Sequence, residues 1–319
     1  MEVEAATPPT PLGEIAMGTT TGLGRRLTAL AAAALALGLS ACTATGGPAS
    51  TTATTRHTTS STPGAASTTL EPERDVTVAG RHFKARCAGS GPSVVMVTDY
   101  GRSMDDAWGT VPQTLAASAR VCIYDRLGIG RSDPAPDRQT FATLAADLDG
   151  VITDLGLTRP VVVMGHSMGA PIALSWASRH GADTRAVVLM DPMPPGYFGP
   201  DGALLTLLPP KDVGDPELSS LWTDLDHFND PATNKESLDP SSWASYARLA
   251  TMSVPLYDLV DAQAQTWPAA VDAKKVDAAW RAAQRRVLAL SSPSELVNVP
   301  TPDAWPQTIK RVLDRALRS

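Results

Sequence analysis

The chain has 319 residues, a net charge of −6 at neutral pH and 43% hydrophobic residues. It is long enough for one domain with a full hydrophobic core. Acidic residues outnumber basic ones and no basic patch is present in the sequence, which excludes nucleic acid as a partner.

The N-terminal region has the features of an export signal. Arg25-Arg26 precede residues 27–39, an uncharged run rich in alanine and leucine. This run is too short to span a bilayer, so we interpret it as a signal-peptide core. It ends in the sequence LSAC at residues 39–42, which resembles a bacterial lipobox. We therefore expect a signal peptide over residues 1–41 and a lipid on Cys42, which would hold the exported protein at the outer face of the cytoplasmic membrane.

Two alternatives stay open for this segment. It could be an ordinary signal peptide in which Cys42 is incidental, and translation could start at Met17 instead of Met1, because residues 1–16 do not resemble the start of a targeting signal.

Residues 42–72 are predicted to be a disordered tether. After Cys42 they are almost entirely Thr, Ser, Ala, Gly and Pro. Such a segment cannot bury enough apolar surface to offset the entropy of ordering it. The folded domain is therefore expected to occupy residues 73–319.

The first part of this domain alternates predicted strands with predicted helices. Strands on both sides of Ala79-Gly80 are followed by further strands and helices in turn. This alternation is typical of a parallel sheet covered by helices on both faces. The predicted strands are 76–88 (two short strands), 93–98, 120–125, 161–164 and 185–190, and the predicted helices are 108–119, 140–155 and 170–180.

The alternation stops after Asp191. Residues 192–250 are rich in proline and acidic residues and contain several aromatic residues, so we interpret them as a cap inserted over the ends of the strands. The pattern then resumes to the end of the chain, with predicted strands at 253–260 and 295–299 and predicted helices at 276–290 and 308–317.

A Gly-His-Ser-Met-Gly sequence at residues 165–169 joins a predicted strand to a predicted helix. Glycines are needed there because the turn is strained and the strand and helix come very close. Such a turn lifts the Ser167 hydroxyl out of the sheet toward a substrate. The backbone N–H of Met168 would then face a developing oxyanion.

Three segments in this order resemble the α/β-hydrolase superfamily. Residues 124–133 (YDRLGIGRSD) resemble its turn after the fourth strand, residues 165–169 its nucleophile turn, and residues 187–192 (VVLMDP) its sixth strand. The resemblance is close over residues 75–192 and loose over 250–319. It implies a mostly parallel, eight-stranded sheet with helices on both faces and an inserted cap, and hydrolysis of a small-molecule ester, amide or lipid-like substrate.

The two cysteines left after Cys42 are expected to form a disulfide. An even number of cysteines in an exported domain favours a bridge over two free thiols. In the fold that the resemblance implies, the second strand lies beside the fourth, which would place Cys87 next to Cys122.

The chain departs from the resemblance at the catalytic base. The superfamily supplies a histidine after its last strand, but residues 296–306 contain none, and no histidine lies in the last 92 residues. We expect His166 to be a structural residue near the surface that points away from Ser167, and His180 to cap a helix C-terminus. His82 lies in an early strand and His57 in the tether, which leaves His227, in the cap, as the histidine that could reach Ser167.

The oxyanion site and the acid of the resemblance also show departures. By position, the Tyr100 amide would be the second oxyanion donor beside Met168. Asp99 stands where a glycine is usual, and its carboxylate would repel an oxyanion unless it turned toward solvent. Asp191, Asp258 and Asp261 stand where the acid would be, and each could equally be a turn residue.

Two functions remain in competition. One is a serine hydrolase in which Ser167 attacks and either His227 or an aspartate acting through water replaces the missing base. The other is a non-catalytic relative that binds a ligand or protein at the cell envelope. Neither a metal nor a dinucleotide cofactor is implied, because the chain has no clustered His and Cys ligands and no glycine-rich phosphate loop after its first strand.

Overall fold

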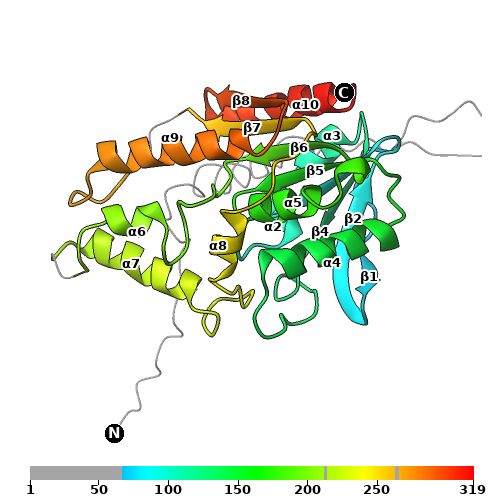
Figure 1. The fold of residues 1–319 in the computed structure, drawn as a ribbon. Coiled ribbons are helices and arrows are strands. Elements are labelled where there is room, and N and C mark those ends of the chain that lie inside the picture. The colour runs from blue at the N-terminus through cyan, green and yellow to red at the C-terminus, as the bar shows by residue number, and fades with distance from the viewer. Residues whose placement is uncertain (1–66, 212–213, 263–265) are drawn as a thin grey trace, which may run out of the picture.

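The computed structural model describes residues 67–211, 214–262 and 266–319. Eight strands form one sheet in the order β1-β2-β4-β3-β5-β6-β7-β8, which confirms the predicted fold class (Figure 1). All neighbouring strands pair in parallel except at β1–β2 and β2–β4. The strands are β1 (Arg74–Val78), β2 (Arg81–Ala88), β3 (Ser93–Val97), β4 (Arg120–Tyr124), β5 (Val161–His166), β6 (Thr184–Met190), β7 (Leu256–Asp261) and β8 (Ser294–Val299).

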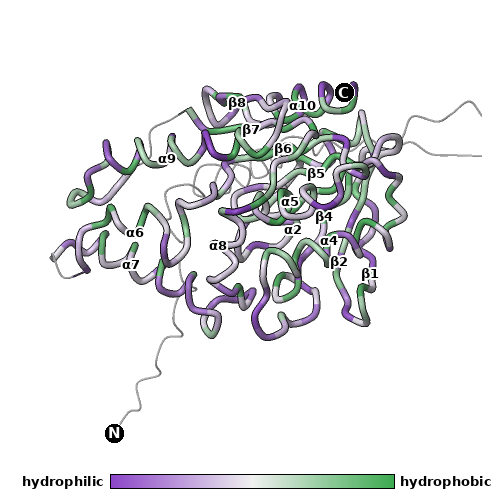
Figure 2. The backbone as a smooth tube through the Cα atoms, in the orientation of Figure 1, coloured by the Kyte–Doolittle hydropathy of each residue, from purple (hydrophilic) through white to green (hydrophobic). Residues whose placement is uncertain are grey.

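Helices cover both faces of the sheet and divide the core into two layers. One layer packs the sheet against α4 (Phe141–Asp154), α5 (Gly169–Ala177) and α9 (Ala273–Ala289). The other packs it against α2 (Met104–Trp108), α3 (Val111–Leu115) and α10 (Trp305–Ala316). Figure 2 shows the hydrophobic residues concentrated in the central strands between these layers. Single-turn 3-10 helices lie at Gly181–Asp183 and Pro302–Ala304.

The predicted helix over residues 108–119 is wrong, since the chain forms α2 and α3 there instead. Gly109, with φ of 50°, ends α2, because a left-handed residue cannot continue a right-handed helix. Pro112 stands in the first turn of α3, where its missing N–H costs nothing. The two strands predicted on either side of Ala79-Gly80 are confirmed as β1 and β2, which pair antiparallel. Both turn residues have the positive φ that a tight two-residue turn requires.

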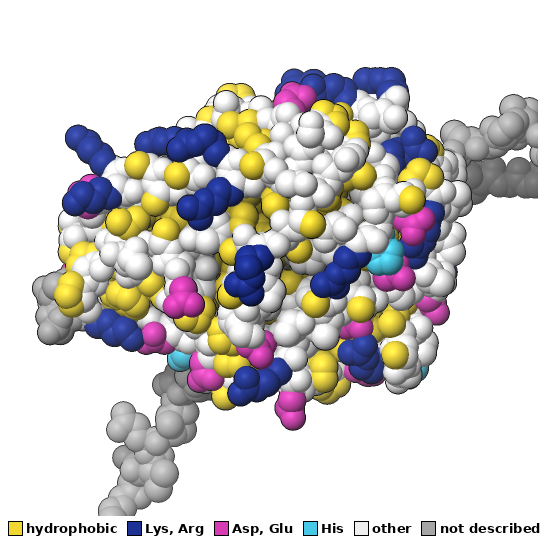
Figure 3. Space-filling view, viewed as in Figure 1, with side chains coloured by type: hydrophobic (Ala, Val, Ile, Leu, Met, Phe, Trp, Pro, Cys, Tyr) yellow, Lys and Arg dark blue, Asp and Glu magenta, His cyan; other side chains and the backbone are white. Residues whose placement is uncertain are grey.

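Three short segments of the cap are helical: α6 (Ala203–Leu207), α7 (Pro216–Asn229) and α8 (Ser242–Tyr246). Their apolar side chains join the core layer of α4 and α5. Figure 3 shows charged and hydrophobic side chains interspersed on this side of the molecule, with basic side chains along α9. The cap is therefore packed onto the sheet domain as part of one core.

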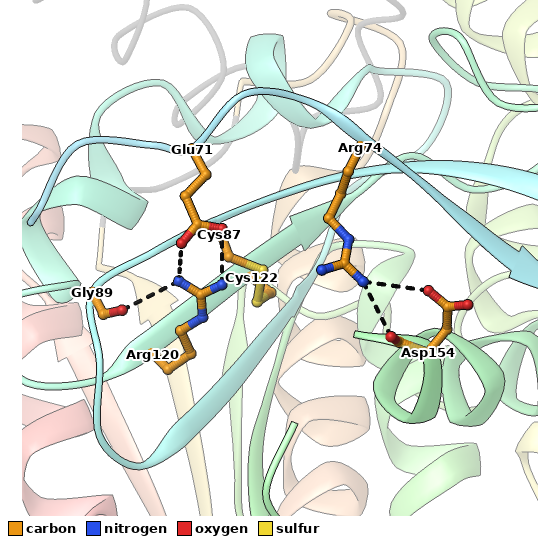
Figure 4. The surroundings of a disulfide bond; sticks show 7 residues. All are labelled: Glu71, Arg74, Cys87, Gly89, Arg120, Cys122 and Asp154. Atoms are coloured by element: carbon orange, nitrogen blue, oxygen red, sulfur yellow. Dashed lines mark hydrogen bonds and ion pairs between the residues drawn. A yellow bond between two sulfur atoms is a disulfide. The ribbon is translucent and has the colours of Figure 1, made fainter. Parts of the chain in front are cut away.

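Residues 67–72, which the sequence assigns to the tether, contact the folded domain. The Glu71 N–H donates to the Cys87 carbonyl at 2.8 Å, and the Glu71 carboxylate pairs with Arg120 (Figure 4). Leu70 packs against the core layer of α10. These contacts join groups far apart in sequence, which explains why composition alone did not indicate them.

The predicted disulfide is present. Cys87 in β2 lies directly opposite Cys122 in β4, and their sulfur atoms are bonded (Figure 4). The bridge closes a loop of 35 residues, so the chain-entropy model assigns it roughly 4 kcal/mol of stabilisation. It fastens the antiparallel edge of the sheet to the strands that carry the candidate site.

Candidate active site

A strained turn places Ser167 between β5 and α5. Ser167 has φ of 48°, a left-handed conformation that costs a non-glycine residue free energy. The glycines on either side allow the close approach. A Cβ built on Gly169 would lie 2.2 Å from the Val97 carbonyl oxygen, and one on Gly165 would lie 2.7 Å from the Gly169 carbonyl oxygen. The local sequence thus builds the turn that was predicted.

The Ser167 side chain is fully buried and its hydroxyl has no hydrogen-bond partner among the residues that the structure describes. Its backbone is held from both sides: the Ser167 N–H donates to Met190 at 3.0 Å, and the Met193 N–H donates to Ser167 at 3.1 Å. The Tyr246 hydroxyl on α8 donates to the Met193 carbonyl at 3.1 Å. Hydrogen bonds thus connect the cap to the serine turn, and the serine lies beneath a closed surface.

Two backbone N–H groups beside the serine are free. Met168 precedes the first turn of α5, where N–H groups have no partner within the helix. Tyr100 follows the end of β3 on the neighbouring strand. Within the described part of the chain neither N–H donates to another group. Both predicted oxyanion donors are therefore available to a ligand.

Two buried carboxyl groups lie on adjacent strands, one just after β6 and the other within β7. Asp191 follows β6, and its Oδ1 accepts the Asp261 N–H at 2.8 Å. Burial raises the pKa of Asp191 to about 7. Asp258 is fully buried within β7, and neither of its oxygens has a hydrogen-bond partner among the described residues. Burial, together with the charge of Asp191, raises the pKa of Asp258 well above its usual range.

The Asp191 carboxyl should make the stability of the protein depend on pH. Its pKa is about 7 in the folded state and 3.8 for an unperturbed aspartate, so between these values the folded state binds more protons than the unfolded state, and stability falls as pH rises. We expect Asp191 to contribute a drop of about 3 kcal/mol in the free energy of unfolding between pH 4.5 and pH 8, and the raised pKa of Asp258 adds to the drop. Urea denaturation across this range measures the drop.

Asp191→Asn removes this contribution and should make the profile shallower, leaving the fall that the raised pKa of Asp258 causes, whereas Asp201→Asn, which replaces an exposed carboxyl in the cap, should leave the profile unchanged. An Asp191→Asn profile as steep as that of the wild type would contradict the assignment.

None of the histidines in the described ranges contacts the Ser167 hydroxyl. His227 is exposed in the last turn of α7, so it does not act as the base in this conformation. His180 follows α5 and stacks on Trp176 with ring centroids 4.9 Å apart, while His82 lies in β2 with Nδ1 3.3 Å from the Thr77 hydroxyl. His57 lies outside the described residues.

The expected surface position of His166 is wrong. His166 is fully buried beside Trp108, with ring centroids 6.0 Å apart, on the sheet face that α2 and α10 cover. Burial lowers the pKa of its imidazole, so it is held in the neutral form. Asp99 does not face solvent either: its carboxylate is buried, 3.3 Å from Arg102 and 3.8 Å from His166 Nδ1. The Arg102 guanidinium therefore reduces the repulsion that the Asp99 carboxylate would exert on an oxyanion.

A buried ion pair that sequence reasoning missed lies behind the Tyr100 turn. Arg126 Nε donates to Glu236 Oε2 at 2.6 Å, and both side chains are fully buried. Arg126 belongs to the motif after β4, whereas Glu236 comes from the cap segment between α7 and α8, 110 residues later. No local pattern marks Glu236, because its partner is distant in sequence.

Comparison with known protein families agrees with this architecture. Residues 92–268 match the model of a family described as the alpha/beta hydrolase fold, and this range is more than half of the chain. The chain belongs to the alpha/beta-hydrolase fold family.

Curated relatives in this α/β-hydrolase family carry several activities in their names. The chain is 32% identical over 146 residues to the non-heme chloroperoxidase CPO-A1 of Kitasatospora aureofaciens, covering 44% of this chain and 50% of that protein. It is 31% identical over 120 residues to the cis-3-alkyl-4-alkyloxetan-2-one decarboxylase of Xanthomonas campestris, covering 33% and 40%. The chain thus spans half or less of the length of these relatives.

Solved structures share the α/β-hydrolase fold at low identity. An esterase from Thermogutta terrifontis superposes with a TM-score of 0.52 at 19% identity, covering 78% of this chain and 98% of that one. The epoxide hydrolase CorEH superposes with a TM-score of 0.53 at 15% identity, covering 78% and 99%. At these identities the likeness concerns the fold alone.

Across the described ranges of this α/β-hydrolase, three or more His, Cys, Asp or Glu side chains nowhere gather in a way that could hold a metal ion. Within the same ranges, every helix is too short or too polar to cross a bilayer. The predicted signal peptide and Cys42 lie outside the described residues.

Proposed function

We propose that this protein is a serine hydrolase that cleaves esters or related acyl compounds with an apolar acyl group. The observation that carries the proposal is the buried Ser167 hydroxyl in a left-handed turn, flanked by the free N–H groups of Met168 and Tyr100. A nucleophile and N–H donors that bind the oxyanion are the parts that acyl transfer needs.

The reaction begins when Ser167 Oγ attacks the substrate carbonyl carbon. The hydroxyl proton passes through a water molecule to the Asp191 carboxylate, and the oxyanion accepts hydrogen bonds from Met168 and Tyr100. Breakage of the bond to the leaving group returns that proton to the departing alcohol. A second water then attacks the acyl-serine and gives a proton to Asp191. The bond between Ser167 Oγ and the acyl carbon breaks as the acid departs, and Oγ takes that proton back from Asp191, which regenerates both groups.

Asp191 is the best-placed substitute for the missing histidine. It directly follows Met190, whose carbonyl accepts the Ser167 N–H, so the two residues are neighbours at the ends of adjacent strands. Its pKa of about 7 suits a general base near neutral pH. Burial and the charge of Asp191 raise the pKa of Asp258 well above its usual range, which favours the neutral form of Asp258 beside the proposed base.

The substrate must enter by displacing part of the cap, because Ser167 is fully buried. Aromatic side chains are packed against one another in the cap layer, among them Phe198, Phe228 and Trp243. Partly buried hydrophobic side chains, such as Leu205 and Trp222, lie at its edge. This environment favours a lipid-like or other apolar acyl group over a charged one.

We further propose that the protein is a lipoprotein anchored through Cys42. The lipobox-like residues 39–42 support this, and residues 43–66 provide a connection of up to roughly 80 Å between the lipid and the domain. Incorporation of a palmitate analogue in cells that is lost in Cys42→Ala would support anchoring. Incorporation in neither protein would contradict it.

A non-catalytic ligand-binding protein is the second candidate. It is favoured by the lack of any hydrogen bond from a histidine to Ser167 within the described residues. In that case the closed cap would retain a ligand instead of a reacting substrate, and Ser167 would be preserved only as part of the turn.

Labelling with a fluorophosphonate separates the two candidates. If Ser167 is activated, the purified full-length chain should become covalently labelled, and Ser167→Ala should lose all labelling. Ser175→Ala, which alters a buried serine on α5, is the matched control and should still be labelled. The labelling rate should rise as pH increases through about 7 and Asp191 loses its proton. A folded wild-type protein that is not labelled would rule out the hydrolase.

A further inference from the structure

The peptide groups before and after Tyr100 are both hydrogen-bonded to the Arg126–Glu236 ion pair. Arg126 Nη2 donates to the Asp99 carbonyl at 2.7 Å. Glu236 Oε1 accepts the Gly101 N–H at 3.1 Å. Nη2 of Arg126 also donates to Glu236 Oε1 at 2.7 Å. The carbonyl before Tyr100 and the N–H after it are therefore anchored to a single buried unit.

This unit is rigid. Besides its bonds to Glu236, Arg126 donates through Nη1 to the Thr98 carbonyl at 2.8 Å and the Thr98 hydroxyl at 2.9 Å. The planar guanidinium of Arg126 therefore donates hydrogen bonds from both of its edges. The Arg126 and Glu236 side chains are 1% and 0% exposed, so water cannot replace these contacts.

The hold on the Asp99 carbonyl sets the direction of the Tyr100 N–H. The peptide between Asp99 and Tyr100 is trans, and in a trans peptide the C=O and N–H point in opposite directions. Because Arg126 fixes the carbonyl on one side, the Tyr100 N–H is directed away from Arg126. That N–H is one of the two free donors beside Ser167.

We infer that the Arg126–Glu236 pair is a positioning device that aims the Tyr100 N–H as an oxyanion donor, and that Glu236 makes this donor depend on how the cap is seated. The inference rests on the proposed hydrolase activity for its catalytic consequence. Glu236 belongs to the cap segment between α7 and α8. A cap shift that withdrew Glu236 would release the Gly101 N–H and leave Arg126 without its counter-ion.

Two charge-neutral double variants test the positioning role of the pair, and they differ only in the residue at position 236. Arg126→Met with Glu236→Gln retains a side-chain oxygen that can accept the Gly101 N–H, whereas Arg126→Met with Glu236→Leu does not. Replacing both members of a buried ion pair is often tolerated, so both variants should fold. Glu217→Gln, an exposed change on α7, is the control for the cap surface and should behave as the wild type.

The first measurement is amide hydrogen exchange at Tyr100 and Gly101, which needs no activity. Exchange should be fastest in the Glu236→Leu double variant, slower in the Glu236→Gln double variant and slowest in the wild type. The second is the fluorophosphonate labelling rate, expected to fall about 100-fold in the Glu236→Leu double variant and about 10-fold in the Glu236→Gln double variant, because loss of one oxyanion donor costs about 100- to 1,000-fold.

The two measurements can contradict the proposed hydrolase and the positioning inference independently of each other. A wild type that is not labelled would overturn the proposed hydrolase, while the exchange data would still decide whether the pair positions Tyr100. Equal exchange at Tyr100 and Gly101 in all three proteins would overturn the inference, as would wild-type labelling rates in both double variants. If one double variant does not fold, the other is compared with the wild type alone, and unchanged exchange at Tyr100 and Gly101 there overturns the inference equally.

Discussion

Gly169→Ala is expected to prevent the protein from reaching its folded state. The added Cβ would lie 2.2 Å from the Val97 carbonyl oxygen and 2.7 Å from the Thr98 carbonyl oxygen. Both obstacles are backbone atoms at the end of a central strand, so no side-chain rotation relieves the overlap. We expect a loss of at least about 4 kcal/mol, which approaches the total stability of many domains. The soluble yield and the thermal unfolding temperature of the Gly169→Ala protein measure this loss of stability.

Gly181→Ala is the matched control for this substitution. Gly181 is exposed in the single-turn 3-10 helix after α5, and a Cβ there would meet nothing within 4 Å. Its stability should stay within about 0.5 kcal/mol of the wild type. A Gly169→Ala protein that unfolds at the wild-type temperature would show that the approach of α5 to β3 is looser than described.

Arg126→Met is expected to destabilise the protein by about 3–5 kcal/mol, because it leaves the Glu236 carboxylate buried without its counter-ion. It also removes the donors to the Thr98 and Asp99 carbonyls. The defect should be larger at pH 8 than at pH 5, since an unpaired buried carboxylate is most costly when ionised. Urea denaturation at both pH values measures it.

Arg138→Met provides the comparison for Arg126→Met. Arg138 is 72% exposed and pairs with Asp239 in the same cap segment at 3.5 Å. Exposed ion pairs contribute less than about 1 kcal/mol, so this variant should be near neutral. Equal losses in Arg126→Met and Arg138→Met would contradict the importance assigned to burial of the Arg126–Glu236 pair.

In the proposed site, Ser167 and the two N–H donors are in place while the cap covers them. Ser167, Met168 and Tyr100 come from the sheet domain, whereas Glu236 and the Met193–Tyr246 hydrogen bond connect the site to the cap. The contacts that hold the donors are therefore the ones that a moving cap would disturb. Access and oxyanion binding are thus coupled in the proposed enzyme.

Local sequence was sufficient for those features that depend on neighbouring residues. The serine turn follows from the steric needs of Gly165 and Gly169, and the first hairpin follows from Ala79-Gly80, because a turn is decided by the backbone freedom of a few consecutive residues. The pairing of Cys87 with Cys122 followed from the strand order that the family resemblance implied. One continuous helix over 108–119 does not form, because Gly109 ends α2 and Pro112 stands in the first turn of α3.

The remaining features depend on contacts between distant segments. Glu71 meets Arg120, and Glu236 meets Arg126, across 49 and 110 residues. The burial of Asp191, which raises its pKa to about 7, likewise requires the packed strands and cap. The amino-acid pattern was therefore enough to predict the sheet and the serine turn. That residues 228–319 contain no histidine can be seen in the sequence itself. The raised pKa for which we propose Asp191 as the base, and the ion pair behind Tyr100, depend on the folded structure, because charge, burial and hydrogen bonding are properties of neighbours in space.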